Sequence, residues 1–142
     1  MRFLRLSPLL LSFASLGLCS ITGCGSSKPA TVTGSIKVPS NVKMVDTDSV
    51  EIRFIPTGGG VAASTSYTYK DGTFKAEVLP GTYKVTVNIT PYAGMPDSEK
   101  RHREMENWIK KFDEGQSTLT VEIGSEANQT ITIDMDKKTV TK

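Results

Sequence analysis

The feature that most constrains this chain is the repeated alternation of apolar and polar residues. Residues 31–38 read TVTGSIKV and residues 50–55 read VEIRFI, with an apolar or small residue at every second position. This spacing matches the two-residue repeat of a β-strand, whereas the apolar face of a helix repeats every 3.6 residues. Residues 39–49 are mostly polar and predict a loop. The pattern therefore predicts two half-buried strands.

Turn signals separate the next three predicted strands. Residues 61–69 are rich in β-branched and aromatic side chains, and the DG pair at 71–72 is a strong hairpin signal. Residues 74–78 and 83–89 alternate again, with LPG at 79–81 as a tight turn between them. We expect third, fourth and fifth strands joined by short turns.

The alternation then breaks, and residues 97–112 carry apolar side chains at helical spacing. Asp97 or Ser98 is a suitable N-cap, and acidic and basic residues lie near the ends that the helix dipole favours. We predict one inserted helix near 97–112. Its apolar stripe is more typical of packing than of ligand binding, and the sequence leaves both readings open for Met105, Trp108, Ile109 and Phe112.

Residues 119–123 and 131–135 return to strand alternation, and a polar tail follows over 137–142. Because only one helix exists to cross between parallel strands, short strands joined by turns favour a sandwich of two antiparallel sheets. The fold class predicted is mainly β, with about seven strands in a domain over residues 31–136.

The N-terminus has the pattern of a signal peptide over residues 1–23. A short basic region, MRFLR, precedes about a dozen mostly apolar residues and then small residues. Spanning a bilayer requires about twenty predominantly apolar residues, so this segment is too short for a membrane span. We expect export from the cytoplasm.

Ile21-Thr22-Gly23-Cys24 resembles the lipobox of bacterial lipoproteins. The resemblance implies cleavage before Cys24, a diacylglycerol on its sulfur, and a lipidated tether over residues 24–30. Several acyl chains hold a protein on a membrane far longer than one does. In that family a small residue precedes the modified cysteine, whereas Leu18 precedes Cys19. Gly25 points to the outer membrane, and an ordinary secretory signal cut near residues 25–26 is the alternative.

The charge balance excludes one class of partner. The chain has 17 basic and 15 acidic residues, and Arg2 and Arg5 belong to the leader, so the rest is electrically balanced. Nucleic-acid binding depends on a basic face that displaces counterions from phosphates. We therefore expect no nucleic-acid partner.

Three segments together resemble known envelope domains. DGTFKAEVLPGTYKVTV at 71–87 is similar to the hairpin of carboxypeptidase regulatory-like and transthyretin-like domains. TVTGSI at 31–36 and WIKKFDEGQSTLTVEI at 108–123 resemble segments of planctomycete-type lipoproteins, although Trp108 and Lys110 depart from the usual pattern. The resemblance implies an antiparallel Greek-key sandwich at the cell envelope and no particular activity.

Candidate chemical groups are few. His102 and Glu106 stand one helical turn apart and could offer two metal ligands, but a zinc site requires a third and usually a fourth. The acid pairs at 46 and 48 and at 134 and 136 lack the oxygen-rich spacing of a calcium loop, so solvated turns explain them better. No cofactor and no catalytic residue is predicted.

The sequence thus predicts a lipid-anchored cell-envelope module that is a non-enzymatic binding or structural protein, attached to the membrane through Cys24. An envelope glycan or protein partner is left unidentified. The alternative is a soluble periplasmic carbohydrate- or peptide-binding domain, in which Trp108 would lie on an exposed aromatic platform with Tyr92, Met105 and Phe112. A metal-dependent enzyme that uses His102 is the third hypothesis.

Overall fold

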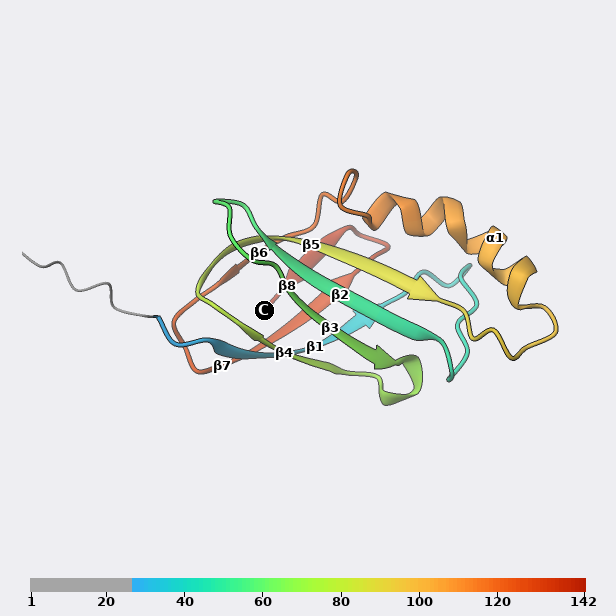
Figure 1. The fold of residues 1–142 in the computed structure, drawn as a ribbon, viewed down its shortest axis with the longest axis horizontal. Coiled ribbons are helices and arrows are strands. Elements are labelled where there is room, and N and C mark those ends of the chain that lie inside the picture. The colour runs from blue at the N-terminus through green and yellow to red at the C-terminus, as the bar shows by residue number, and fades with distance from the viewer. Residues whose placement is uncertain (1–26) are drawn as a thin grey trace, which may run out of the picture.

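A computed structural model describes residues 27–142, which form two four-stranded sheets and one α-helix (Figure 1). The expected signal peptide and Cys24 lie outside the described residues. Within the described part of the chain, no helix is long and apolar enough to cross a membrane.

The first sheet contains β4 (Phe74–Val78), β1 (Ala30–Lys37), β7 (Asn128–Asp134) and β8 (Thr139–Thr141), in that order. β1 is antiparallel to β4, and β7 is antiparallel to β8. β1 and β7, however, pair in parallel. The prediction of a wholly antiparallel fold is therefore wrong at this pair, where two strands far apart in sequence meet without a hairpin to set their direction.

The second sheet contains β3 (Ala63–Thr68), β2 (Ser49–Pro56), β5 (Gly81–Thr90) and β6 (Thr120–Ile123), in that order. All of its neighbouring strands are antiparallel. The strands predicted near 50–55 and 83–89 are the two central strands of this sheet. One face of each strand lies on the core and the other is more exposed, which explains why their alternation is clear in the sequence.

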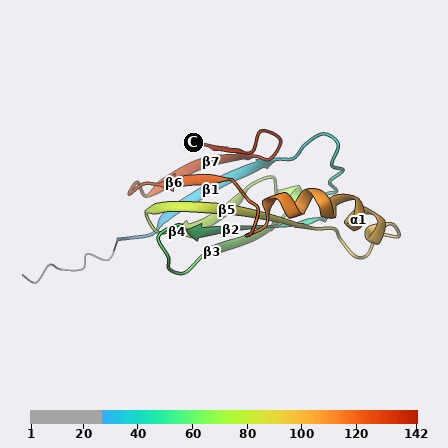
Figure 2. The same ribbon diagram turned by 90° about the horizontal axis from the view of Figure 1, so that it is seen from above.

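Both sheets contribute to one hydrophobic core, and Figure 2 shows β7 and β1 of the first sheet on the opposite side of the molecule from β2 and β3 of the second. Inward-facing side chains alternate along β1, β2, β4 and β5 with more exposed ones. The fold is thus mainly β, as predicted. Among the largest fully buried side chains are Phe54, Ile52, Ile89, Ile131 and Ile133.

The DG pair, predicted as a hairpin signal, and LPG, predicted as a tight turn, both carry the chain between the sheets. β3 and β4 flank the DG pair but belong to different sheets, and so do β4 and β5 around LPG. A short 3-10 turn (η1, Tyr69–Asp71) replaces the tight hairpin, and Gly72 ends it in the left-handed conformation, with φ of 68°. A Gly in that conformation is favoured after a helical turn as well as in a hairpin. The residue type alone therefore did not distinguish the two uses.

The inserted helix is present where the sequence predicts it. α1 (Ser98–Ile109) is followed by a 3-10 turn, η2 (Lys110–Phe112), and lies at the opposite end of the sheets from the first described residue (Figure 1). Asp97 occupies the N-cap position, but its side chain makes no capping hydrogen bond. The helix is thus held mainly by packing of its apolar stripe rather than by its cap.

The described chain has eight strands rather than about seven. The additional strand is β8, which lies in the predicted polar tail and pairs with the end of β7. The turn between them includes a hydrogen bond from the backbone N–H of Lys137 to Asp134 Oδ1, at 2.9 Å. β8 is three residues long with a single apolar residue, Val140, so it offers no alternation for sequence analysis to detect.

Gly34 explains the glycine in the TVTGSI segment. It lies in β1 directly opposite Phe74 of β4. A Cβ atom on Gly34 would stand 2.6 Å from Phe74 Cε1 and 2.8 Å from the backbone oxygen of Ile131, which is too close for either contact. Only glycine allows the aromatic ring to lie across this strand.

Tyr83 explains the tyrosine that follows the LPG turn. Its side chain is buried, and its hydroxyl donates a hydrogen bond of 2.7 Å to the backbone oxygen of Leu79. This bond fixes the start of β5 against the preceding turn, as tyrosine corners do in β-sandwich proteins.

Candidate functional site

A groove runs between α1 and the loop that joins β1 to β2, at the helical end of the molecule. Its volume is about 410 Å³. Trp108, Met105 and Lys100 line it from the helix, and Val42 and Lys43 line it from the loop. The groove therefore combines apolar surface with charged side chains of both signs, since Asp97 and Glu104 also line it.

An ion pair between Arg101 and Asp48 lies under this groove. Arg101 Nη2 is 2.5 Å from Asp48 Oδ2, and Nη1 is 3.2 Å from Oδ1, so the pair is bidentate. The side chain of Asp48 is fully buried and that of Arg101 is 9% exposed. The sequence interpretation that placed Asp48 in a solvated turn is wrong, because Asp48 and Arg101 neutralise each other away from water.

Further hydrogen bonds satisfy most of the remaining polar atoms of this pair. Asp48 accepts backbone N–H bonds from Val45, at 2.9 Å, and from Tyr92, at 3.1 Å. Arg101 Nη2 also donates to the backbone oxygen of Lys43, at 3.1 Å. The hydrogen bond to Asp48 raises the pKa of Arg101 above its ordinary value, although burial opposes this. Arg101 and Asp48 together thus link the loop, the β5–α1 connection and the helix.

One sequence signal could have identified Arg101. It precedes Met105 by four residues and Phe112 by eleven, so it falls on the apolar stripe of the helix rather than on the charged face. A basic residue at a buried stripe position requires an acidic partner. The sequence gives no comparable signal for Asp48, because its partner lies 53 residues away.

The apolar stripe packs against the core along most of its length. Met105 and Phe112 are buried, and Trp108 and Ile109 are half-buried against the same core cluster. The rings of Trp108 and Phe112 are 5.0 Å apart between centroids. Tyr92 is 52% exposed but does not line the groove. The aromatic platform of four residues is therefore not formed, and Trp108 is the only aromatic side chain that lines the groove.

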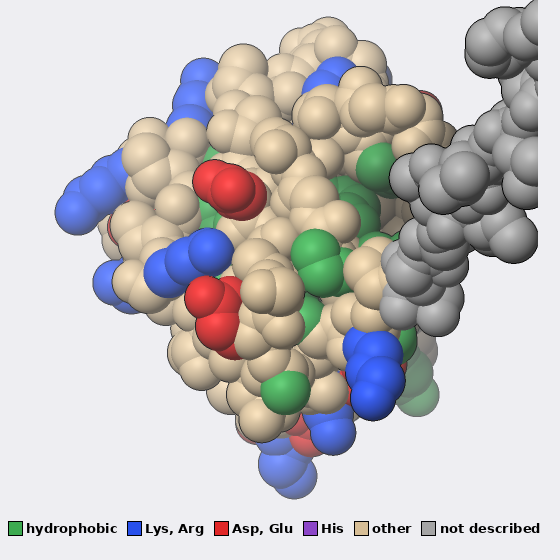
Figure 3. Space-filling model, turned by 90° about the vertical axis from the view of Figure 1, so that its left-hand side faces the viewer, with side chains coloured by type: hydrophobic (Ala, Val, Ile, Leu, Met, Phe, Trp, Pro, Cys, Tyr) green, Lys and Arg blue, Asp and Glu red, His purple; other side chains and the backbone are tan. Residues whose placement is uncertain are grey.

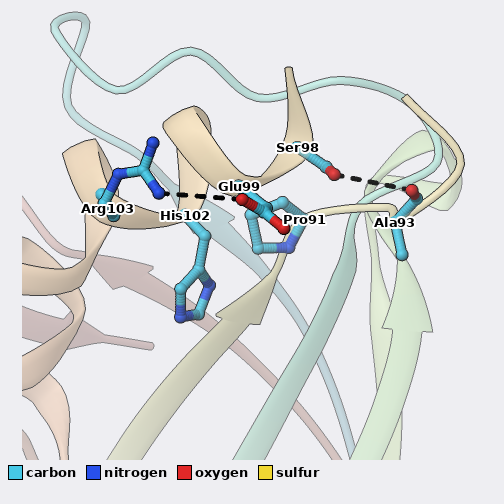
Figure 4. Close-up of a pocket in the computed structure, with 6 residues that line it drawn as sticks. All are labelled: Pro91, Ala93, Ser98, Glu99, His102 and Arg103. Atoms are coloured by element: carbon cyan, nitrogen blue, oxygen red, sulfur yellow. Dashed lines mark hydrogen bonds and ion pairs between the residues drawn. The ribbon is translucent and has the colours of Figure 1, made fainter. Parts of the chain in front are cut away.

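His102 lies on the other side of α1, in a shallow pocket of about 290 Å³ (Figure 4). Its side chain is exposed. The ring points away from the nearby Arg103–Glu99 ion pair, in which the closest N and O atoms are 3.8 Å apart. Ser98 Oγ donates to the backbone oxygen of Ala93 across the same pocket, at 3.5 Å. Ser98, Glu99 and Arg103 thus each have a partner other than His102.

Glu106, the other half of the predicted metal-ligand pair, is bound to Lys110 at 2.7 Å. The hydrogen bond from Lys110 lowers the pKa of Glu106, and the neighbouring charges of Lys110 and His102 act in the same direction. In residues 27–142 no group of three or more His, Cys, Asp or Glu side chains is placed to hold a metal ion.

The remaining acidic candidates act in turns. Asp134 accepts the backbone N–H of Lys137 and thereby shapes the β7–β8 turn. Asp46 and Asp136 are exposed, and the backbone oxygen of Asp46 accepts the N–H of Lys70 at 3.0 Å. Apart from Asp48, these residues behave as the sequence predicts.

No protein-family model matches the chain, and neither the search of curated proteins nor that of solved structures found a match.

Proposed function

We propose that this protein is a lipid-anchored module of the bacterial cell envelope, attached through Cys24 and without enzymatic activity. Its domain would be a Greek-key sandwich of the transthyretin or carboxypeptidase regulatory type. The observation that carries the proposal is the position of the lipobox-like segment at 21–24, immediately before a folded domain whose first strand begins at Ala30.

The short link between Cys24 and Ala30 supports a domain that stays close to the membrane. A fully extended chain covers at most about 3.6 Å per residue, so this link reaches roughly 20 Å. A lipid on Cys24 would then confine the domain to the layer next to the bilayer surface. By the rule for lipoprotein sorting, Gly25 favours the outer membrane.

The non-enzymatic assignment is supported by how the charged groups are engaged. Arg101 and Asp48 neutralise each other under the groove, and Glu106 is paired with Lys110. His102 is the single histidine of the chain and is exposed on a helix surface. A general base requires a partner that orients it towards a reacting group, and the neighbours of His102 are engaged elsewhere.

The test is expression in a lipoprotein-processing bacterium, followed by intact mass and membrane fractionation. We expect cleavage before Cys24, added mass from diacylglycerol and acyl groups, and sedimentation with the outer membrane. Cys24→Ala should lose the added mass and the membrane association together.

Cys19→Ala is the matched control, because it removes the other cysteine of the leader without changing the lipobox. This variant should be processed and anchored like the unchanged protein. If anchoring survived Cys24→Ala but were lost with Cys19→Ala, the lipid would be on Cys19 and the proposed site would be wrong. An unmodified soluble product would reject the lipid anchor altogether.

The second candidate function is a soluble carbohydrate- or peptide-binding domain. The groove favours it, because Trp108 lines this groove and remains partly accessible. Aromatic side chains beside polar groups are a common arrangement for small-ligand sites.

Tryptophan fluorescence tests this candidate directly, since Trp108 is the only tryptophan in the chain. Titration with peptidoglycan fragments and with short envelope-derived peptides should change its emission if the groove binds them. Lys100→Ala alters the groove, whereas Lys111→Ala changes an exposed lysine outside it. Equal responses of the two variants would place any binding elsewhere.

A further inference from the structure

A third hollow lies at the opposite end of the molecule from α1, where the described chain begins. Its volume is about 430 Å³. The loop between β2 and β3 and the LPG turn between β4 and β5 form most of it, and Ser27, the first described residue, also lines it. Figure 3 faces this end of the molecule and shows hydrophobic side chains reaching the surface among charged ones.

Two exposed hydrophobic side chains, Val61 and Leu79, line this hollow. Val61 is 93% exposed and Leu79 is 51% exposed. Together with Tyr92 they are the large hydrophobic residues that residues 27–142 expose. Two of these three therefore lie on two loops at one end, and both line the same hollow.

The two loops carry no charge. They read TGGGVA over residues 57–62 and LPGT over residues 79–82. Gly59 and Gly60 have φ angles of 83° and 127°, a conformation that residues with a side chain rarely adopt. The glycines thus let the backbone turn sharply just before Val61. Uncharged, exposed and apolar loop tips are suited to the boundary between lipid headgroups and acyl chains, where charged side chains are unfavourable.

The proposed lipid anchor at Cys24 is close in sequence to this hollow. Residues 1–26 precede Ser27, and Cys24 stands three residues before it. Three extended residues reach roughly 10 Å. A lipid on Cys24 would therefore enter the bilayer within a short distance of this hollow, which Ser27 lines.

We propose that this loop end is a membrane-contact surface, with Val61 and Leu79 inserted at the lipid interface. This inference rests on the proposed lipid anchor at Cys24. The acyl chains supply the attachment, because burial of two aliphatic side chains alone is too weak to hold a domain on a membrane. The loops instead fix the orientation of the domain, so that α1 and the Trp108 groove at the far end face the aqueous phase (Figure 1).

The experiment uses the full chain, processed and lipidated, with a single new cysteine for a fluorescent label. Cys19 is expected to leave with the signal peptide and Cys24 to carry the lipid, so the new thiol is the only reactive one. Val61→Cys places the label on the proposed contact surface, at an exposed position where it disturbs no packing. Ala93→Cys is the matched control, at an exposed position beside the N-terminus of α1.

Each labelled protein is reconstituted into vesicles of phosphatidylethanolamine and phosphatidylglycerol. We expect a lipid-attached nitroxide quencher to act several-fold more strongly on the label at position 61 than at position 93, and aqueous iodide to show the opposite preference. Equal quenching at both positions, in protein that sediments with the vesicles, would overturn the proposed contact and leave the anchor intact.

Two other outcomes identify other occupants or a different failure. A label at position 61 that is protected from iodide but not quenched by the lipid nitroxide would mean that a second copy of the chain covers this end, which overturns the proposal. Protein that lacks the lipid mass and remains in the supernatant would reject the anchor at Cys24, and the membrane-contact surface with it.

Discussion

Arg101 of α1 and Asp48 at the end of the β1–β2 loop form a bidentate ion pair that is almost completely shielded from water. The pair joins three segments that are distant in sequence, because Asp48 also binds the N–H of Tyr92 and Arg101 also binds the oxygen of Lys43. Loss of either charge would leave the other one buried without compensation, which costs far more than loss of a surface ion pair.

We predict that Arg101→Met lowers the free energy of unfolding by about 3–5 kcal/mol, the range expected when one partner of a buried pair is removed. Methionine preserves most of the side-chain volume, so the loss should come from the charge rather than from a cavity. Arg103→Met, on the exposed side of the same helix, should change stability by less than about 1 kcal/mol. Urea unfolding followed by circular dichroism measures both.

A double-mutant cycle separates the ion pair from general damage to the helix. Asp48→Asn retains an oxygen that can accept a backbone N–H bond but removes the charge. Combined with Arg101→Met, it should cost less than the sum of the two single variants. Strict additivity would show that the two residues do not stabilise each other.

The sequence predicts where the strands and the helix lie better than it predicts which strands pair with each other. Alternation located the two central strands of the second sheet, because each is flanked by strands and buried on its inner face. It could not show that the DG and LPG turns cross between sheets, since a turn that contains glycine serves both arrangements. β8 was not predicted because its three residues include only one apolar side chain and so show no alternation. The parallel pairing of β1 with β7 was not predicted because the two strands are far apart in sequence.

At the candidate site, the helix and its stripe were predictable from spacing, and the groove was not. A groove depends on how a loop lies against a helix, and that is decided here by Asp48 and Arg101. Arg101 stands in register with Met105 and Phe112, so its burial could have been inferred. The partner could not, because a long-range contact to one acid among several has no local signature.

Gly34→Ala should destabilise the protein although alanine is ordinarily the better residue within a strand. The new Cβ would meet the ring of Phe74 and the backbone oxygen of Ile131. We expect a loss of about 1–3 kcal/mol in the free energy of unfolding, as is typical of overpacking. Phe74→Leu should offset part of this loss in the double variant, because it removes the ring. A neutral or stabilising Gly34→Ala would contradict the close approach.

Two tyrosine hydroxyls offer a matched comparison. Tyr83 donates a hydrogen bond to Leu79, so Tyr83→Phe should cost about 0.5–1.5 kcal/mol. The Tyr67 hydroxyl is buried and has no hydrogen-bond partner among the described residues. Removing it in Tyr67→Phe should leave stability unchanged or raise it, because a buried unpaired polar group is unfavourable. Chemical denaturation measures the free energy of unfolding of both variants. A larger loss in Tyr67→Phe than in Tyr83→Phe would refute the hydrogen bonding assigned to the two hydroxyls.

The Tyr67 hydroxyl should ionise at a higher pH than an ordinary tyrosine in an alkaline titration. Burial, with a smaller contribution from the neighbouring Tyr69, raises the pKa of Tyr67 to about 12, compared with about 10 for an ordinary tyrosine. The folded state therefore keeps this phenol protonated after the unfolded state has begun to ionise. The free energy of unfolding should therefore be unaffected by this ionisation below about pH 10 and should fall as the pH rises from 10 towards 12, because the folded state binds the proton more tightly. Tyrosinate absorbance measures the ionisation, and circular dichroism shows whether the protein is still folded.

The difference between the unchanged protein and Tyr67→Phe isolates this residue from the other three tyrosines. A difference titration centred near pH 10 in folded protein would show that the Tyr67 hydroxyl is open to water.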